Sequence, residues 1–377
     1  MDEATDTVAP EESKVVSLTH VTDVSLSDLQ AMAAAFGLKD IKENLKYPIS
    51  VDKLIYKTTY KGKIISASGL IYTPKAPGIP LPILSAHHGT TFKKSEAPSV
   101  SYGLSQEEFA ASSGFIILVP DYIGYGASED IFHPYYDEYH SAKAVTDMIK
   151  AGKEIMNKNK VQLNSKLFLF GYSEGGYVTL AAQKAIEAEQ NFGLILTGVA
   201  AGAGGYDLSQ MLSTVTSSSS YSYPAYLAFV IQSFNQTNDW NKPLSYFFAD
   251  KYAEHLTLML DGSYGGGQIN SQLTTETASL LNSGFYENIK GNGELEFKKT
   301  LIKNSLVNWT PKTPLRLYHG TMDEIIPYQN SEQVYQKFKQ AGSNVELNLI
   351  SNGTHGSSFL PMIESVFPWF EELNRSN

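Results

Sequence analysis

Short apolar runs recur along the chain, and stretches with a helical spacing of apolar residues separate most of them. A run of about four to eight apolar residues is typical of a strand buried on both faces of a sheet. We expect such strands at residues 82–86, 115–119, 166–170, 194–200, 315–318 and 345–350. The helical patterns fall at residues 105–112, 138–156, 175–189 and 330–341. Because strand and helix alternate, this pattern predicts an α/β fold with a mostly parallel sheet, covered by helices on both faces.

The pattern differs before the first of these strands. Residues 51–59 and 64–73 alternate polar and β-favouring side chains on either side of a Lys61-Gly62 turn. This predicts an antiparallel hairpin at the N-terminal edge of the sheet. Residues 25–36 have the apolar spacing of a helix, and residues 1–24 are expected to form a disordered tail.

One long stretch interrupts the alternation of strands and helices. Residues 206–300 contain no buried strand pattern, are rich in Ser, Tyr and Phe, and include apolar segments with helical spacing. We interpret this stretch as a helical cap inserted after one strand of the sheet. The predicted α/β core then consists of residues 25–205 and 301–377.

Composition narrows the classes of protein to which the chain can belong. It has 377 residues, of which 42% are hydrophobic, so it can bury a large core. Its formal net charge of −10 argues against binding to nucleic acid or an anionic membrane, and no apolar run is long enough to span a bilayer. The chain has no cysteine, which excludes disulfides, thiolate metal sites and a cysteine nucleophile.

The first residues leave the cellular compartment open. Residues 1–13 are acidic and polar, and they lack the basic start and apolar centre of a signal peptide. One interpretation is the tail of a cytoplasmic protein. The other is the mature start of a secreted, periplasmic or lipid-anchored protein whose signal was removed and replaced by Met1.

A G-x-S-x-G motif lies between a predicted buried strand and a predicted helix. It consists of Gly171, Tyr172, Ser173, Glu174 and Gly175. At such a turn the serine hydroxyl is exposed above the sheet, and the glycines let a strained backbone pass close to a neighbouring strand. This setting predicts Ser173 as a nucleophile, with an ordinary tight turn as the alternative.

A serine nucleophile needs a base, and the base needs an acid that fixes its tautomer. His355 lies in a loop after the last predicted strand and is the expected base. Asp323 follows the preceding predicted strand and is the expected acid, because both loops reach the same edge of the sheet. His319 is a rival base that we expect to pack or cap at a strand end, and Glu324 and Asp207 are alternative acids.

Two backbone amides are expected to stabilise the negative oxygen that develops when a serine attacks an ester. One amide belongs to Glu174, directly after the predicted nucleophile. The other follows the predicted strand at residues 82–86, where Gly89 permits close backbone approach. It belongs to Thr90 or, alternatively, to Thr91.

Two further motifs have a structural interpretation. His87-His88 has the appearance of a metal-ligand pair, but no carboxylate or third histidine stands at ligand spacing nearby, so no metal site is expected. The segment from Asp121 to Ser128 contains Gly-x-Gly but lacks the third glycine and the helix start of a nucleotide-binding loop. We expect Asp121 to brace a turn beside the site.

Taken together, these residues resemble the α/β-hydrolase superfamily. The matching segments occur in the order of that superfamily and are His88-Gly89, Asp121–Gly126, Gly171–Gly175, His319–Pro327 and His355. The resemblance covers residues 50–375, and the expected cap is similar to that of bacterial esterases and secretory lipases within the superfamily. It implies hydrolysis through an acyl-enzyme without a cofactor. The absence of cysteine departs from many secreted relatives, because no disulfide can brace the cap.

The sequence therefore predicts a serine hydrolase of carboxylic esters, either a carboxylesterase or a lipase, with an ester or acylglycerol as its small-molecule partner. Tyrosines and phenylalanines in residues 206–300 favour short-to-medium acyl or aryl esters over long-chain triglycerides. Two other functions remain open. A serine peptidase of the same fold would need an amine-binding group, which no acidic pair in the cap clearly supplies. A binding protein on a hydrolase scaffold would usually lack one member of the triad.

Overall fold

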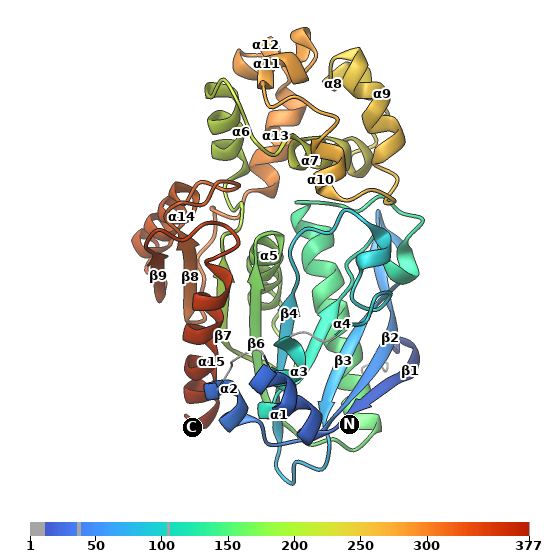
Figure 1. Cartoon of the computed structure of the whole chain (residues 1–377), viewed down its shortest axis with the longest axis vertical. Coiled ribbons are helices and arrows are strands. Elements are labelled where there is room, and N and C mark those ends of the chain that lie inside the picture. Colours follow the sequence, from blue (N-terminus) through green and yellow to red (C-terminus); the bar gives the residue numbers. More distant parts are fainter. Residues whose placement is uncertain (1–11, 36–38, 104–105, 377) are drawn as a thin grey trace, which may run out of the picture.

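The central structural feature is a nine-stranded sheet, which Figure 1 shows with helices around it. The computed structural model describes residues 12–35, 39–103 and 106–376. The strands are β1 (Val15–Val24), β2 (Ile49–Tyr60), β3 (Lys63–Pro74), β4 (Leu81–His87), β5 (Ile116–Pro120), β6 (Leu163–Tyr172), β7 (Ile195–Gly202), β8 (Leu315–Gly320) and β9 (Val345–Ile350). Their order across the sheet is β1-β2-β3-β5-β4-β6-β7-β8-β9.

The sheet is mostly parallel and has an antiparallel N-terminal edge, which confirms the sequence-based expectation. The strands from β4 to β9 pair in parallel, whereas β1, β2 and β3 pair antiparallel with one another, and β3 runs antiparallel to β5. β4 and β5 are buried along their whole length, so uninterrupted apolar runs mark them in the sequence.

The edge strand β1 corrects the sequence-based expectation for the N-terminus. The disordered tail predicted for residues 1–24 is wrong over residues 15–24, which form β1 and pair with β2. Most side chains of β1 are exposed or half-buried, so its sequence resembles that of a solvated tail, and hydrogen bonds to β2 give it order. The predicted hairpin of β2 and β3 is present, but β1 covers its outer side. Residues 1–11 lie outside the described residues.

Helices on the two faces of the sheet close two hydrophobic cores. α4, α5 and α14 contribute to the core on one face, and α1, α3 and α15 to the core on the other. Together with α2, these helices are α1 (Leu26–Ala35), α2 (Lys39–Asn44), α3 (Gln106–Ser113), α4 (Glu138–Lys158), α5 (Glu174–Ala188), α14 (Gln329–Gln340) and α15 (Phe359–Arg375). Asp137 caps α4 by accepting a hydrogen bond from the His140 amide, which satisfies a donor of the first turn.

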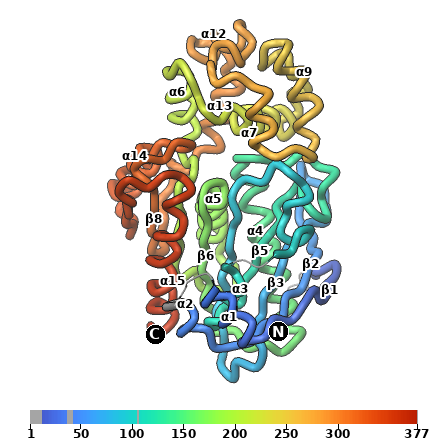
Figure 2. Tube along the Cα trace, in the orientation of Figure 1, coloured from blue at the N-terminus to red at the C-terminus, as the bar shows by residue number. Residues whose placement is uncertain are grey.

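A layer of helices between β7 and β8 lies beyond the carboxyl ends of the parallel strands (Figures 1 and 2). We call residues 208–304 the helical layer. Its helices are α6 (Leu208–Ser217), α7 (Pro224–Thr237), α8 (Leu244–Phe247), α9 (Asp250–Met259), α10 (Gly266–Asn270), α11 (Thr277–Leu280), α12 (Ser283–Lys290) and α13 (Leu295–Asn304). Aromatic rings pack inside it: the Phe285 centroid lies 5.2 Å from that of Phe247 and 5.5 Å from that of Phe297. The layer occupies the predicted insertion, and its last helix extends past the expected boundary at residue 300.

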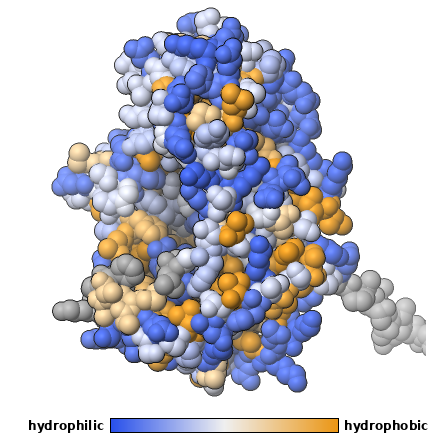
Figure 3. Space-filling view, turned by 45° about the vertical axis from the view of Figure 1, so that its right-hand side comes forward, coloured by the Kyte–Doolittle hydropathy of each residue, from blue (hydrophilic) through white to orange (hydrophobic). Residues whose placement is uncertain are grey.

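The surface of the helical layer differs from that of the α/β core. On the face that Figure 3 shows, the layer is mostly hydrophilic, and hydrophobic side chains gather lower, over the core. Within the described ranges, no helix combines the length and the apolar character that crossing a membrane requires.

Candidate active site

Ser173 lies at the sharp turn between β6 and α5. Its backbone φ of +59° and ψ of −125° are rare for a residue with a side chain, and its amide donates to the Gly202 carbonyl at 2.8 Å. A Cβ on Gly171 would collide with the Gly175 carbonyl, and a Cβ on Gly175 would collide with the His87 carbonyl. The strained turn therefore needs glycine at both positions, which the motif supplies.

The side chains of Ser173, His355 and Asp323 form one chain of hydrogen bonds. His355 Nδ1 lies 2.7 Å from Asp323 Oδ2, and His355 Nε2 lies 2.9 Å from Ser173 Oγ. Because a carboxylate only accepts hydrogen bonds, the proton lies on Nδ1, and Nε2 is left to accept from the serine hydroxyl. Asp323 comes from the loop after β8 and His355 from the loop after β9. The structure thus brings together the three residues that the sequence singles out.

Asp323 is held by donors on both of its oxygens. Oδ1 accepts from the amides of Ile325 and Ile326, both at 2.9 Å, and Oδ2 lies 3.2 Å from His319 Nε2. Burial by itself would raise the pKa of the Asp323 carboxyl, but hydrogen bonds from His319 and His355 outweigh burial and hold that pKa well below its usual range. The group is therefore a carboxylate at neutral pH.

His319, the rival base, is fully buried at the end of β8. Its Nδ1 lies 2.7 Å from Ser331 Oγ, and its Nε2 lies 2.8 Å from the Ile326 carbonyl as well as close to Asp323. It packs at a strand end, as expected, and it also orients Asp323, which the sequence interpretation missed. The signal in the sequence was the spacing of four residues between His319 and Asp323, because one tight turn can bring side chains at that spacing together.

In the described part of the chain, neither alternative acid bonds the His355 ring. Glu324 Oε2 instead accepts from the His355 backbone amide at 3.1 Å, and so holds the loop. Asp207 caps α6 by accepting from the Gln210 amide at 3.1 Å. Tyr172, whose role the sequence did not reveal, donates its hydroxyl to the His355 carbonyl at 2.7 Å. Two side chains therefore fix the backbone that presents the imidazole.

The backbone of residues 88–91 runs beside Ser173. A Cβ on Gly89 would lie 3.6 Å from Ser173 Cβ, an ordinary van der Waals contact, so the loop lies beside the serine but leaves room for a Cβ at this position. Glu174 is the first residue of α5, and its amide has no carbonyl one turn earlier in the helix to bond. The amides of Glu174 and of Thr90 or Thr91 remain the predicted pair of oxyanion donors.

The two adjacent histidines have separate environments. His87 is buried between Thr179 Oγ1 at 2.7 Å and Ser85 Oγ at 3.0 Å, and burial lowers its pKa to about 3, so its ring is neutral. The His88 ring stacks on Tyr122, with ring centroids 4.2 Å apart. Over the described ranges, no group of three or more His, Cys, Asp or Glu side chains is arranged to hold a metal ion.

Asp121 is buried under the loop that follows β5. Its carboxylate accepts from the hydroxyls of Ser68 and Ser99, each at 2.5 Å, and from the Ser99 amide at 2.7 Å. Ser68 Oγ in turn accepts from the Ala127 amide at 2.8 Å. Asp121 therefore joins three segments of backbone, which is the bracing position that the sequence predicts.

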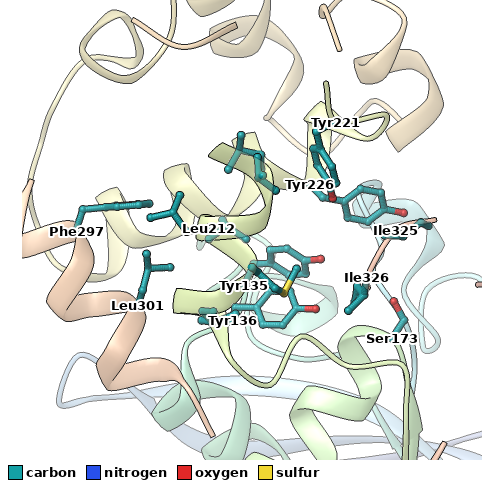
Figure 4. A pocket seen from close by; sticks show the side chains of 15 residues that line it. Tyr135, Tyr136, Ser173, Leu212, Tyr221, Tyr226, Phe297, Leu301, Ile325 and Ile326 are labelled. Carbon is teal, nitrogen blue, oxygen red and sulfur yellow. The ribbon is translucent and has the colours of Figure 1, made fainter. Parts of the chain in front are cut away.

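A pocket opens from Ser173 into the helical layer, with a volume of about 60 Å³. Figure 4 shows Ser173 and Ile326 at one end, Tyr135 and Tyr136 between, and Leu301 on the opposite side. Most of the lining side chains are apolar, and most belong to the helical layer. The hydroxyl of Ser173 thus faces a small cavity bordered by tyrosines and aliphatic groups.

The family model for secretory lipases matches residues 108–372, a span that includes Ser173, Asp323 and His355. The chain belongs to the secretory lipase family. Among curated members, Lipase 6 of Candida albicans is 25% identical over 249 residues, which cover 60% of this chain and 48% of that protein. This secretory lipase chain spans about half the length of the curated relatives that it matches.

Solved structures share the fold of this member of the secretory lipase family. A protein from Legionella pneumophila is 24% identical with a TM-score of 0.86, and the match covers 97% of this chain and 99% of that one. The rice cell wall degrading esterase LipA from Xanthomonas oryzae is 24% identical with a TM-score of 0.82, and the match covers 94% and 96% of the two chains. These likenesses confirm the α/β-hydrolase fold.

Proposed function

We propose that this protein is a serine hydrolase that cleaves carboxylic esters through an acyl-enzyme. The observation that carries the proposal is the continuous chain of hydrogen bonds from Asp323 through His355 to Ser173, at 2.7 Å and 2.9 Å. Membership of the secretory lipase family supports the same activity.

In the proposed acylation step, Ser173 Oγ attacks the ester carbonyl carbon while its proton passes to His355 Nε2. Asp323 stays ionised because its pKa is low, and it stabilises the imidazolium that forms. The amides of Glu174 and Thr90 would donate to the resulting oxyanion. The tetrahedral intermediate then expels the alcohol, which takes the proton from His355 and leaves the acyl group on Ser173.

Deacylation repeats these roles with water as the nucleophile. His355 Nε2 takes a proton from the water molecule as its oxygen attacks the acyl carbon, and the same two amides would again hold the oxyanion. Collapse of this second intermediate breaks the bond to Ser173 Oγ, which regains its proton from His355. The products are a carboxylic acid and the unmodified serine.

Short-to-medium acyl or aryl esters are the proposed substrates. The pocket beside Ser173 has a volume of only about 60 Å³, which favours a small acyl group over a long chain. Tyr135 and Tyr136 give it apolar rings with polar tips, and such surfaces accept aromatic or partly hydrated groups. The helical layer would serve as a cap that selects the substrate. Acylglycerols are included in the proposed substrates, because the chain belongs to the secretory lipase family.

Fluorophosphonate labelling tests the proposed nucleophile, because these probes react with activated serines. We expect one probe per chain, attached to Ser173 by mass-spectrometric mapping, and no labelling of Ser173→Ala. Ser209→Ala, a change in the helical layer, serves as the control and should label like the wild type. A wild-type protein that remained unlabelled would refute the proposal and favour a binding role on a hydrolase scaffold.

We also propose that the protein is exported from the cell, because it belongs to the secretory lipase family. Fractionation of the producing cells, followed by detection of the fluorophosphonate-labelled protein, tests this. Label confined to the cytosolic fraction would contradict the proposal.

A further inference from the structure

Glu174, the residue after Ser173, carries a buried carboxylate that the proposed reaction does not use. Its Oε1 lies 2.7 Å from His133 Nε2, and the two side chains are only 2% and 5% exposed. The second oxygen, Oε2, is buried and has no hydrogen-bond partner among the described residues. Burying a carboxyl group with one unpaired oxygen destabilises a fold, so stability alone does not account for this side chain.

The hydrogen bonds of His133 tie Glu174 to a distant stretch of backbone. His133 Nδ1 lies 2.7 Å from the Ile123 carbonyl, which can only accept, so Nδ1 carries a hydrogen. The separation of 2.7 Å between Nε2 and Glu174 Oε1 then requires one proton between these two atoms. Whichever atom holds this proton, the imidazole links the first residue of α5 to the loop after β5.

His133 also lies among three tyrosine rings. Its ring centroid lies 5.9 Å from that of Tyr122, 4.8 Å from that of Tyr125 and 5.9 Å from that of Tyr135. The hydroxyls of these tyrosines reach the loop of residues 88–91. Their partners on the loop are the His88 carbonyl for Tyr122 (2.9 Å), the Thr91 carbonyl for Tyr125 and Thr90 Oγ1 for Tyr135 (2.8 Å).

We propose that the His133–Glu174 pair is a positioning device for the oxyanion site. Through Glu174 it fixes the amide at the start of α5, and through the three tyrosines packed around His133 it fixes the loop that carries Thr90. One buried link thereby sets the separation of the two donors. This inference rests on the proposed function, because it takes those two amides as the donors to the oxyanion.

Two apolar substitutions that break the link provide the test. Removing one oxyanion donor lowers kcat by about 10²- to 10³-fold in other enzymes, so misplacing the donors is expected to cost about 10- to 100-fold. We expect Glu174→Leu and His133→Phe to lower kcat for a short nitrophenyl ester by this factor. KM should stay within about three-fold, because the contacts are made mainly in the transition state.

A conservative variant and a double variant separate positioning from a general structural effect. Glu174→Gln keeps a hydrogen bond, because its amide can donate to His133 Nε2 in the neutral ring, and kcat should stay within about three-fold of the wild type. The double variant Glu174→Leu/His133→Phe should lose no more than the worse single variant, because both changes break the same link.

His140→Phe is the matched control. His140 Nδ1 lies 2.8 Å from Asp137 Oδ1 in another buried pair, at the start of α4 rather than α5. The same substitution there should lower the melting temperature and leave kcat within about two-fold. Should either apolar variant be unfolded at the assay temperature, Tyr122→Phe tests the same link, because it removes only the hydroxyl that donates to the His88 carbonyl and Tyr122 does not line the pocket. We expect kcat of Tyr122→Phe to fall by about three- to ten-fold.

The outcomes distinguish the two proposals. If the wild type is labelled at Ser173 and hydrolyses esters, while Glu174→Leu and His133→Phe keep kcat as His140→Phe does, the positioning role is wrong and the hydrolase remains. A Glu174→Gln variant as impaired as Glu174→Leu would also overturn it. A wild type that neither labels nor hydrolyses esters would refute the hydrolase and the positioning role together.

Discussion

Ser173 has two features that an exposed serine lacks: a backbone turn that presents Oγ above the sheet, and an imidazole nitrogen 2.9 Å away. Both depend on neighbouring residues as well as on Ser173 itself. The turn depends on Gly171 and Gly175, and the imidazole depends on donors and acceptors around His355 and Asp323. We therefore compare substitutions of the residues proposed to react with substitutions of the neighbours that hold those residues in place.

Ser173→Ala removes the proposed nucleophile and leaves the small side chain that the turn requires. Ester turnover is expected to fall by several orders of magnitude, in line with roughly 10⁶-fold losses on triad removal elsewhere. Circular dichroism and the melting temperature should stay close to those of the wild type. A variant with more than a tenth of wild-type kcat would contradict the assignment.

Asp323→Asn and Glu324→Gln form a matched pair at adjacent positions. Asparagine can donate to the imidazole and so favours the wrong tautomer, and kcat is expected to fall by about 10⁴-fold. Glu324 bonds the backbone of His355 and not its ring, so its change should cost far less. Steady-state kinetics of the two variants test the assignment of Asp323 as the acid. A larger loss of kcat in Glu324→Gln than in Asp323→Asn would move that assignment to Glu324.

The low pKa of the Asp323 carboxyl shapes the expected pH profile. Because this pKa lies below its usual range, the carboxylate keeps its charge as the pH falls to about 4 and adds no ionisation there. Histidine ordinarily changes charge between about pH 5 and 8, and its protonated form cannot accept the serine proton. We expect log(kcat/KM) to fall in acid with a slope of one. A slope of two, or a rate unchanged from pH 5 to 9, would contradict a single histidine base.

Among the secondary-structure elements, those buried on both faces were the most predictable from the sequence. β4 and β5 contain only buried residues, so apolar runs mark them without any knowledge of their partners. β1 carries a mixed pattern, and its order depends on pairing with β2, about 30 residues away along the chain, as in the pair His20–Asp52. Local patterns do not report such pairing.

The same distinction explains what was predictable at the site. Ser173, Asp323 and His355 each follow a strand, and parallel strands end at one edge, so their positions in sequence indicate their proximity. The roles of Tyr172 and His133 depend on contacts between segments far apart in the chain. No local motif marks these contacts, because each is created only when the segments pack together.

We expect helices α6 and α13 to determine where the pocket ends. Leu212 and Leu301 line the pocket beside Ser173 and also a wider groove of about 650 Å³ between α6, α12 and α13. Leu212→Ala and Leu301→Ala should each join the two spaces. We expect kcat/KM for esters with longer acyl chains to rise by about ten-fold relative to kcat/KM for the acetate ester, which corresponds to a free-energy difference of about 1.4 kcal/mol. Ile302→Ala, which lines only the groove, is the control. Unchanged chain-length profiles in both leucine variants would show that the pocket ends elsewhere.

The helical layer, which supplies most of the wall of the pocket beside Ser173, is mostly hydrophilic on the face that Figure 3 shows. A lipase that works on lipid droplets typically needs an apolar surface for adsorption, whereas an esterase acts on dissolved molecules. The small pocket and this surface together favour the esterase.

Rates on nitrophenyl esters from acetate to palmitate test this choice. We expect kcat/KM to be highest for short or medium chains, with no rise in rate when the substrate exceeds its solubility. An optimum at palmitate with activation at the lipid–water interface would make the protein a true lipase. Aminoacyl arylamides, measured beside the esters, should be poor substrates, and a preference for them would indicate a peptidase.

The helical layer is one uninterrupted stretch of chain, yet it supplies most of the pocket wall, while the residues proposed for bond cleavage all follow strands of the sheet. We therefore expect recognition and chemistry to be separable by exchanging one segment of chain, cut close to residues 206 and 305. Transplanting this segment from a relative should change which esters are accepted and leave the proposed catalytic residues in place. On this expectation, proteins with this layout can change substrates by replacing a single segment of chain.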